Sequence, residues 1–223
     1  MLEIMVKKIL FCLGLVAFVF AQEAQDEEEI ASTGKQKNSE YWKSVFQPSE
    51  VEGNVYGTFR IGYAYQYQNG SKITNTQTSH TFDSKQQLNS VYFGIERGWI
   101  GLKNKMLMVG GYLDGAAGQT FFLSVGARVS ARLLNGWLIP HASFGYQIQH
   151  LSFPTDTAQY NMHGGVGTVG LFVNVAKGFG VDFSLRAGTP FYLVKAADAK
   201  KFNHPVINHV GFMISFTFYD FSI

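Results

Sequence analysis

An apolar–polar alternation of period two recurs from about residue 54 to residue 219, and it carries charged residues in its middle. In GNVYGTFRIGYAYQY (53–67), aromatic and branched side chains occupy one face, while Arg60 shares the other face with Thr58 and Gly62. Successive side chains of a β-strand point to opposite faces, so this pattern predicts a strand. The environment of that strand must accept a guanidinium at its centre.

The same alternation predicts eight strands, one of which is much less regular than the others. In KMLMVGGYLD (105–114) both faces are apolar. The connections alternate in length: WIGLKN, LLNG and KG are short, whereas the others are longer and polar, apart from GAAG. Short turns at one end and longer loops at the other are typical of an outer-membrane barrel. The predicted strands cover residues 54–67, 88–98, 105–114, 119–132, 137–150, 164–176, 179–192 and 206–219.

The predicted strands place their charges on the face that holds glycine, serine and threonine. In lipid, a barrel points apolar side chains outward and keeps a polar lumen, and an arginine on the lipid face costs roughly 2–4 kcal/mol at the bilayer midplane. We therefore predict an all-β fold, an eight-stranded antiparallel up-and-down transmembrane β-barrel with short periplasmic turns and longer extracellular loops. Side chains fill an interior of this size. The predicted lumen ion network consists of Arg60, Glu96, Arg128, Arg132, Asp182 and Arg186.

One arginine breaks this rule. Arg97 follows Ile95 on the predicted outward face, and we expect it to reach the periplasmic interface or to lie at a bulge. Trp99 and Trp137 fall near the short turns, whereas Tyr146 falls near a long loop. Aromatic side chains favour both interfaces of a membrane, so these positions support the predicted barrel.

The first residues indicate export. Lys7 and Lys8 precede the 13-residue apolar run ILFCLGLVAFVFA, which ends in the small-residue pattern Val19-Phe20-Ala21. This pattern is typical of a signal peptide, and the run is too short to span a bilayer as a helix, which needs about 20 residues. We predict a signal peptide at 1–21, an acidic and polar periplasmic extension at 22–52, and the barrel at 53–223. Cys12 is the only cysteine, so disulfides play no part in the predicted fold.

Over about 54–219 the chain resembles the small eight-stranded outer-membrane barrels of Gram-negative bacteria, the OmpA and OmpX type. Besides the architecture, the segment VGFMISFTFYDF is similar to the aromatic-rich terminal strand that the barrel-assembly machinery recognises in that family. Family members usually stop at a terminal Phe, whereas this chain continues to Ile223. The resemblance implies a place in the Gram-negative outer membrane, contact with outer-membrane lipid and lipopolysaccharide, and insertion by that machinery.

The sequence favours a non-enzymatic role, structural or in surface interactions through the loops, with an extracellular ligand as a candidate partner. Lys and Arg total 18 against 16 Asp and Glu, so no basic excess points to nucleic acid. No cofactor is expected. His150, His163, His204 and His209 lack the spacing of metal ligands, so no metal is expected.

Three other functions stay open. The His141-x-Ser143 pair resembles lipid A deacylase barrels, although residue 144 is Phe where that family has Asn. The SEYWKSVF segment, with His80, Asp83 and Ser84, resembles palmitoyl-transferring barrels, which require an apolar lumen. A narrow anion-preferring pore is the third, because arginines outnumber acids in the predicted network.

Overall fold

The computed structural model describes residues 41–43, 45–70, 72–76, 79–101, 105–152, 159–195 and 207–221. The predicted signal peptide and most of the predicted extension lie outside these ranges. The chain divides into two compact units, 1–45 and 46–223. In the first unit only residues 41–43 and 45 are described, and they are helical. The second unit holds every other described residue.

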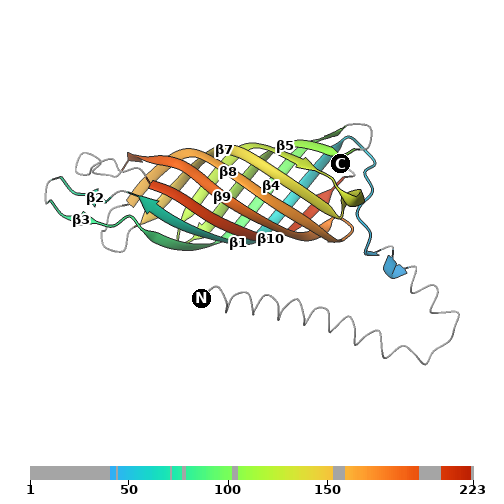
Figure 1. Cartoon of the computed structure of the whole chain (residues 1–223), viewed down its shortest axis with the longest axis horizontal. Helices are drawn as coiled ribbons and strands as arrows, with labels where there is room; N and C mark the ends of the chain where they lie inside the picture. Colours follow the sequence, from blue (N-terminus) through green and yellow to red (C-terminus); the bar gives the residue numbers. More distant parts are fainter. Residues whose placement is uncertain are drawn as a thin grey trace, which may run out of the picture. The chain divides into compact units, whose positions relative to one another are not determined.

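Eight long strands of the second unit close into a barrel in which each strand pairs antiparallel with both neighbours (Figure 1). The first and last of them complete the cylinder, in a continuous register from Gly57 opposite Asp220 to Gly70 opposite Ile207. The predicted all-β, eight-stranded up-and-down fold is therefore confirmed. The strands are β1 (Val55–Gly70), β4 (Gln86–Gly101), β5 (Leu107–Gly118), β6 (Phe121–Ala131), β7 (Leu138–Ser152), β8 (Gln159–Ala176), β9 (Phe179–Lys195) and β10 (Ile207–Asp220).

The strands extend further toward the long loops than the sequence predicts. β1 continues to Gly70, β5 to Gly118, and β8 begins at Gln159 instead of residue 164. These segments are polar or glycine-rich, which favours a loop, but a neighbouring strand supplies the hydrogen bonds that their backbones need. A small hairpin of β2 (Ile73–Thr74) and β3 (Thr81–Phe82) projects from the end of the barrel opposite the C-terminus (Figure 1).

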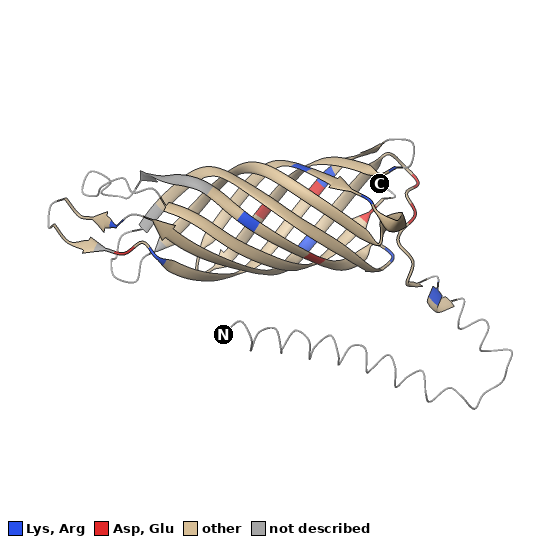
Figure 2. Ribbon diagram, in the orientation of Figure 1, with Lys and Arg blue, Asp and Glu red and all other residues tan. Residues whose placement is uncertain are grey.

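The two faces of the barrel wall have the predicted polarity. Phe144 is 69% exposed on the outer face, whereas Arg60 is 1% exposed inside. In Figure 2 the charged residues of the strands lie between the middle of the barrel and the end that bears the C-terminus. Among the strand residues whose side chains are described, the surface outside these positions is uncharged, as contact with hydrocarbon requires.

An apolar cluster, here called the apolar seal, fills the lumen at the end of the short turns. This arrangement departs from the expectation of a polar lumen throughout. The chain before β1 lies against this end: Val51 packs on the cluster, and Lys105 Nζ donates to the carbonyls of Val51 and Glu52 at 2.6 and 3.1 Å. The apolar seal consists of Tyr56, Ile100, Met108, Ile139, Phe172, Tyr219 and Phe221.

No helix in the described part of the chain is long and apolar enough to cross a membrane.

Candidate functional site

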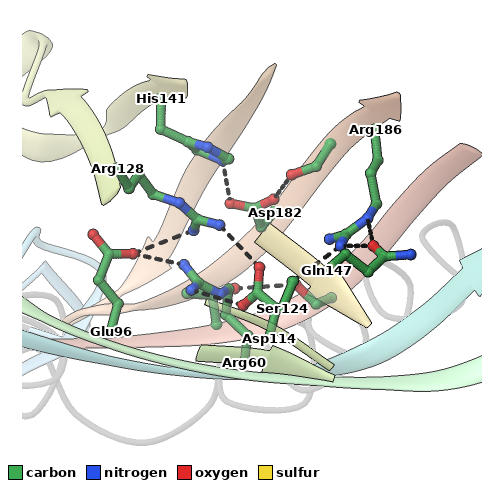
Figure 3. A network of polar contacts seen from close by, with 12 residues as sticks. Arg60, Glu96, Asp114, Ser124, Arg128, His141, Gln147, Asp182 and Arg186 are labelled. Atoms are coloured by element: carbon green, nitrogen blue, oxygen red, sulfur yellow. Dashed lines mark hydrogen bonds and ion pairs between the residues drawn. The ribbon is translucent and has the colours of Figure 1, made fainter. Parts of the chain in front are cut away.

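Four buried charges meet in the middle of the lumen and form what we call the four-charge ring: Arg60, Glu96, Asp114 and Arg128 (Figure 3). Arg60 contacts Glu96 at 2.9 Å and Asp114 at 3.3 Å. Arg128 contacts the same two carboxylates at 3.2 and 3.4 Å. Each arginine thus touches both acids. Because isolated burial of a charge is costly, this alternation is what allows the four to lie inside the barrel.

The sheet register builds this ring from adjacent strands. Gly94 of β4 lies opposite Arg60 of β1 on one side and Asp114 of β5 on the other. A Cβ at Gly94 would lie 2.4 Å from Asp114 Oδ1 and 3.0 Å from Arg60 Nε. The glycine therefore provides the space in which the two side chains meet. Next to it, the Tyr56 hydroxyl donates to Glu96 Oε1 at 2.5 Å and links the ring to the apolar seal.

We expect Gly94→Ala to lower the free energy of unfolding by about 1–3 kcal/mol, because the added methyl group displaces Asp114 from Arg60. The measurement is urea unfolding of the refolded barrel in lipid vesicles. Gly167→Ala is the matched control, since a Cβ there meets nothing nearer than 3.8 Å. Equal effects of the two substitutions would show that Gly94 has no special part in the ring.

A second polar group joins β7 and β9. His141 Nε2 lies 2.7 Å from Asp182 Oδ2, and the Ser184 hydroxyl donates to the other oxygen of the same carboxylate. Figure 3 shows His141 and Asp182 facing each other beside Arg128. Asp182 is thus held by an imidazole and a hydroxyl. The strand pattern predicts Asp182 in the lumen, but it does not predict that His141 is its partner.

Arg186 lies in a third group, on the side of the lumen toward the long loops. Its Nε donates to Gln147 Oε1 at 3.1 Å and its Nη2 to Ser124 Oγ at 3.0 Å, while the guanidinium lies 4.4 Å from the centre of the Phe122 ring. A chain of amides continues from there, because Gln147 Nε2 donates to Gln149 Oε1 at 2.9 Å. No carboxylate in the described residues forms an ion pair with Arg186. Neutral oxygens and an aromatic face stabilise this cation instead.

Arg132 does not join these groups. It follows β6 at the end of the barrel that bears the short turns, where its Nη2 donates to the carbonyls of Ser49 and Asn135 at 3.1 and 2.7 Å. Its guanidinium lies 5.8 Å from the centre of the Phe221 ring. Partial burial lowers the pKa of Arg132 from its ordinary value. This arginine holds the chain before β1 against the barrel.

Asp114 is not among the lumen residues predicted from the sequence. It is the last residue of the predicted strand 105–114, in which both faces are apolar, so no polar face drew attention to it. Alternate residues of a strand share one face, so Asp114 lies on the same face as Gly110 and Tyr112, which is the face toward the lumen. With Asp114 included and Arg132 outside, the described lumen holds three arginines and three acids: Arg60, Arg128, Arg186, Glu96, Asp114 and Asp182. The arginine excess on which the anion-preferring pore depended is absent from the described lumen.

Several residues behind the enzyme alternatives are described in the structure. His141 and Ser143 both point into the lumen, at 5% and 9% exposure, and no hydrogen bond joins them in the described structure. Asp83 accepts the backbone N–H of Lys85 at 3.0 Å, which is a local turn contact, and Ser84 is buried. The described residues contain no group of three or more His, Cys, Asp or Glu that could hold a metal ion.

No protein-family model and no curated protein matches the chain. Among solved structures, it is similar to the attachment invasion locus protein Ail of Yersinia pestis, at 14% identity and a TM-score of 0.44, over 74% of this chain and 100% of that one. It is also similar to OprG of Pseudomonas aeruginosa, at 10% identity and a TM-score of 0.44, over 77% and 99%. The chain is similar as well to Neisserial surface protein A, at 11% identity and a TM-score of 0.37, over 74% of this chain and 97% of that one.

These proteins are small outer-membrane barrels, and the fold of the present chain is assigned from its own strand pairing. Eight antiparallel strands close on themselves, apolar side chains cover the outside, and ionised side chains lie within. The chain therefore has the fold of the small eight-stranded outer-membrane β-barrels.

Proposed function

We propose that this protein is a non-enzymatic barrel of the Gram-negative outer membrane, with a structural or surface-interaction role through its extracellular loops. The observation that carries the proposal is the filled lumen, in which the four-charge ring and the apolar seal lie one behind the other. The loops and the β2–β3 hairpin then remain as the surface available to an extracellular ligand.

The two obstructions differ in chemistry, although the Tyr56–Glu96 hydrogen bond joins them. The four-charge ring is held by ion pairs between 2.9 and 3.4 Å, and its side chains are at most 1% exposed. The apolar seal is held by packing, for example between the rings of Phe172 and Tyr219, whose centres lie 4.8 Å apart. A solute would have to separate both groups to pass.

We expect Arg60→Ala to give no conductance above background in planar bilayers, because the apolar seal still closes the lumen. Phe172→Ala should also stay closed, since the four-charge ring remains. The double variant is expected to conduct, because each substitution opens one of the two obstructions. Large stable channels from wild type or from Arg60→Ala alone would contradict the proposed plug and favour the pore.

A separate experiment, mass spectrometry of lipid A, tests the lipid-modifying alternatives. Mass spectra of lipid A from cells with and without the gene should be identical if the protein is not an enzyme. A lost or gained acyl chain would contradict the proposal and favour a deacylase or an acyltransferase.

The proposed location places the short turns and the segment before β1 in the periplasm and the β2–β3 hairpin outside the cell. Lipopolysaccharide and phospholipid would surround the outer face, and the barrel-assembly machinery would insert the chain. Protease added to intact cells should cut within the connection between β1 and β4 and leave the remaining barrel in the outer-membrane fraction. Cleavage only after the outer membrane is opened would contradict this orientation.

A further inference from the structure

The residues just before β1 cross the end of the barrel that bears the short turns. This segment, residues 49–54, is here called the strap, and it belongs to the same compact unit as the barrel. Glu50 and Glu52 are exposed, whereas Ser49 and Val51 are half-buried. Alternate residues of the strap therefore face the barrel, as in an extended chain that lies on a surface.

The strap contacts all three short turns. At the turn between β8 and β9, a Cβ on Gly178 would come within 2.9 Å of Ser49 Oγ. At the turn between β6 and β7, Arg132 Nη2 donates to the Ser49 carbonyl at 3.1 Å. At the turn between β4 and β5, Lys105 Nζ donates to two successive strap carbonyls, the first that of Val51. The first and the last of these turns lie on opposite sides of the barrel, so the strap spans its mouth.

Main-chain carbonyls of the strap accept these hydrogen bonds. The side chains of Lys105 and Arg132 supply the donors, and Ile100 N adds a hydrogen bond to Asn54 O at 2.8 Å. Hydrogen bonds from a charged donor are stronger than those between neutral groups. The carbonyls are present whatever side chains the strap carries. The two cations of the turns therefore determine whether the strap stays docked.

The docked strap covers part of the apolar seal. Val51 packs against the seal, in which Ile100 and Met108 are each 0% exposed. Arg132, which binds the strap, also lies 5.8 Å from the ring centre of Phe221, a member of the seal. An apolar cluster at an open mouth would meet water, which is unfavourable. The strap occupies the position that water would otherwise take.

The order of the chain determines when the strap can dock. It precedes β1, but its partners lie in the turns that follow β4, β6 and β8. Those turns have their final places only when the corresponding hairpins have formed. The strap therefore completes its contacts after the barrel wall, although it comes first in the sequence.

We propose that the strap is a latch, which closes the short-turn end over the apolar seal and, when released, admits water to the seal. Lys105 and Arg132 are its positioning residues. The inference rests on the proposed function and deepens it, because it makes one of the two obstructions of the lumen depend on the segment that leads into the barrel. The four-charge ring, in contrast, has no contact with the strap among the interactions of the described residues.

Thiol labelling of the folded full-length barrel with a water-soluble maleimide tests the latch. The background is Cys12→Ser, which leaves no native cysteine; Val51→Cys then reports on the strap and Met108→Cys on the seal. We expect Lys105→Met to accelerate labelling at both positions about tenfold, because local opening becomes easier once the charged donor is lost. Lys105→Arg keeps a charged donor and should label at nearly the rate of the unaltered latch.

Lys177→Met is the matched control, since Lys177 is an exposed lysine in the short turn between β8 and β9, and both labelling rates should stay unchanged. Arg132→Met is the second releasing variant and should also accelerate labelling at both positions. All variants must first show the heat-dependent gel mobility of a closed barrel.

Unchanged labelling of Val51→Cys in both releasing variants would overturn the latch. Faster labelling of Val51→Cys alone, with Met108→Cys still protected, would show that the strap does not cover the seal and would overturn the proposal as well. A wild type that conducts would overturn the proposed plug without altering these labelling rates, so the two failures can be told apart.

Discussion

Asp114→Ala is expected to lower the free energy of unfolding by about 3–5 kcal/mol, the range for breaking a buried ion pair on one side only. The substitution leaves Arg60 and Arg128 facing each other with Glu96 as their single shared acid. Two guanidiniums that are at most 1% exposed cannot turn to water for the missing partner. Urea unfolding of the barrel in lipid vesicles measures the loss.

The double variant Asp114→Ala with Arg128→Ala distinguishes the ring from four separate contacts. Removing one charge of each sign restores the balance, so the double variant should lose less stability than the sum of the two single variants, by at least about 1 kcal/mol. Glu50→Ala, an exposed acid before β1, should change stability by no more than about 0.5 kcal/mol. Simple additivity, or a loss below about 1 kcal/mol for Asp114→Ala, would mean that the four charges do not act as one unit.

Val125→Arg is expected to cost about 2–4 kcal/mol in a bilayer, the cost of an arginine at the midplane on the lipid face of a barrel. Val125 is 58% exposed on the outer face, in the middle of β6. On a surface that faces water the same change would alter stability by no more than about 0.5 kcal/mol. Unfolding in phosphatidylcholine vesicles therefore tests which solvent this face contacts.

Val129→Arg is the matched control for depth. Val129 lies on the same face of the same strand, two residues from the end of β6, and is 49% exposed. Near the interface the cost should fall to about 0–1 kcal/mol, because the side chain reaches water. Equal and small effects at both positions would contradict the assignment of this face to lipid.

The sequence was sufficient to predict which side of the barrel wall the lumen charges occupy, because the alternation of side chains between the two faces of a strand is a local property. These charges are Arg60, Glu96, Arg128, Asp182 and Arg186. Side chains alternate whatever the neighbouring strands do, and one register slip would move a charge to the lipid. The number of strands followed from the same repeats, since each one is bounded by glycine or polar residues. These features needed no knowledge of which strands meet across the lumen.

Pairing across the lumen could not be predicted in this way. His141 and Asp182 lie on β7 and β9, which are not neighbours in the sheet, so their contact depends on the diameter and shear of the closed barrel. Phe172 was missed for a different reason: it lies on the inward face of β8 between Gly170 and Asn174, and these neighbours give no sign of an apolar lumen. Counting every second residue along β6 puts Arg132 on the lumen side. It lies just beyond the end of β6, however, where the strand pattern no longer fixes the direction of its side chain.

The seam between β1 and β10 has a consequence for assembly. The two strands that close the cylinder are separated by more of the chain than any other neighbouring pair, and the ladder between them runs from Gly57 to Gly70 on β1. Until they meet, both edges expose unpaired amides and carbonyls, which hydrocarbon does not tolerate. For a barrel of the proposed location, we therefore expect entry into the bilayer to be coupled to the joining of the two edges.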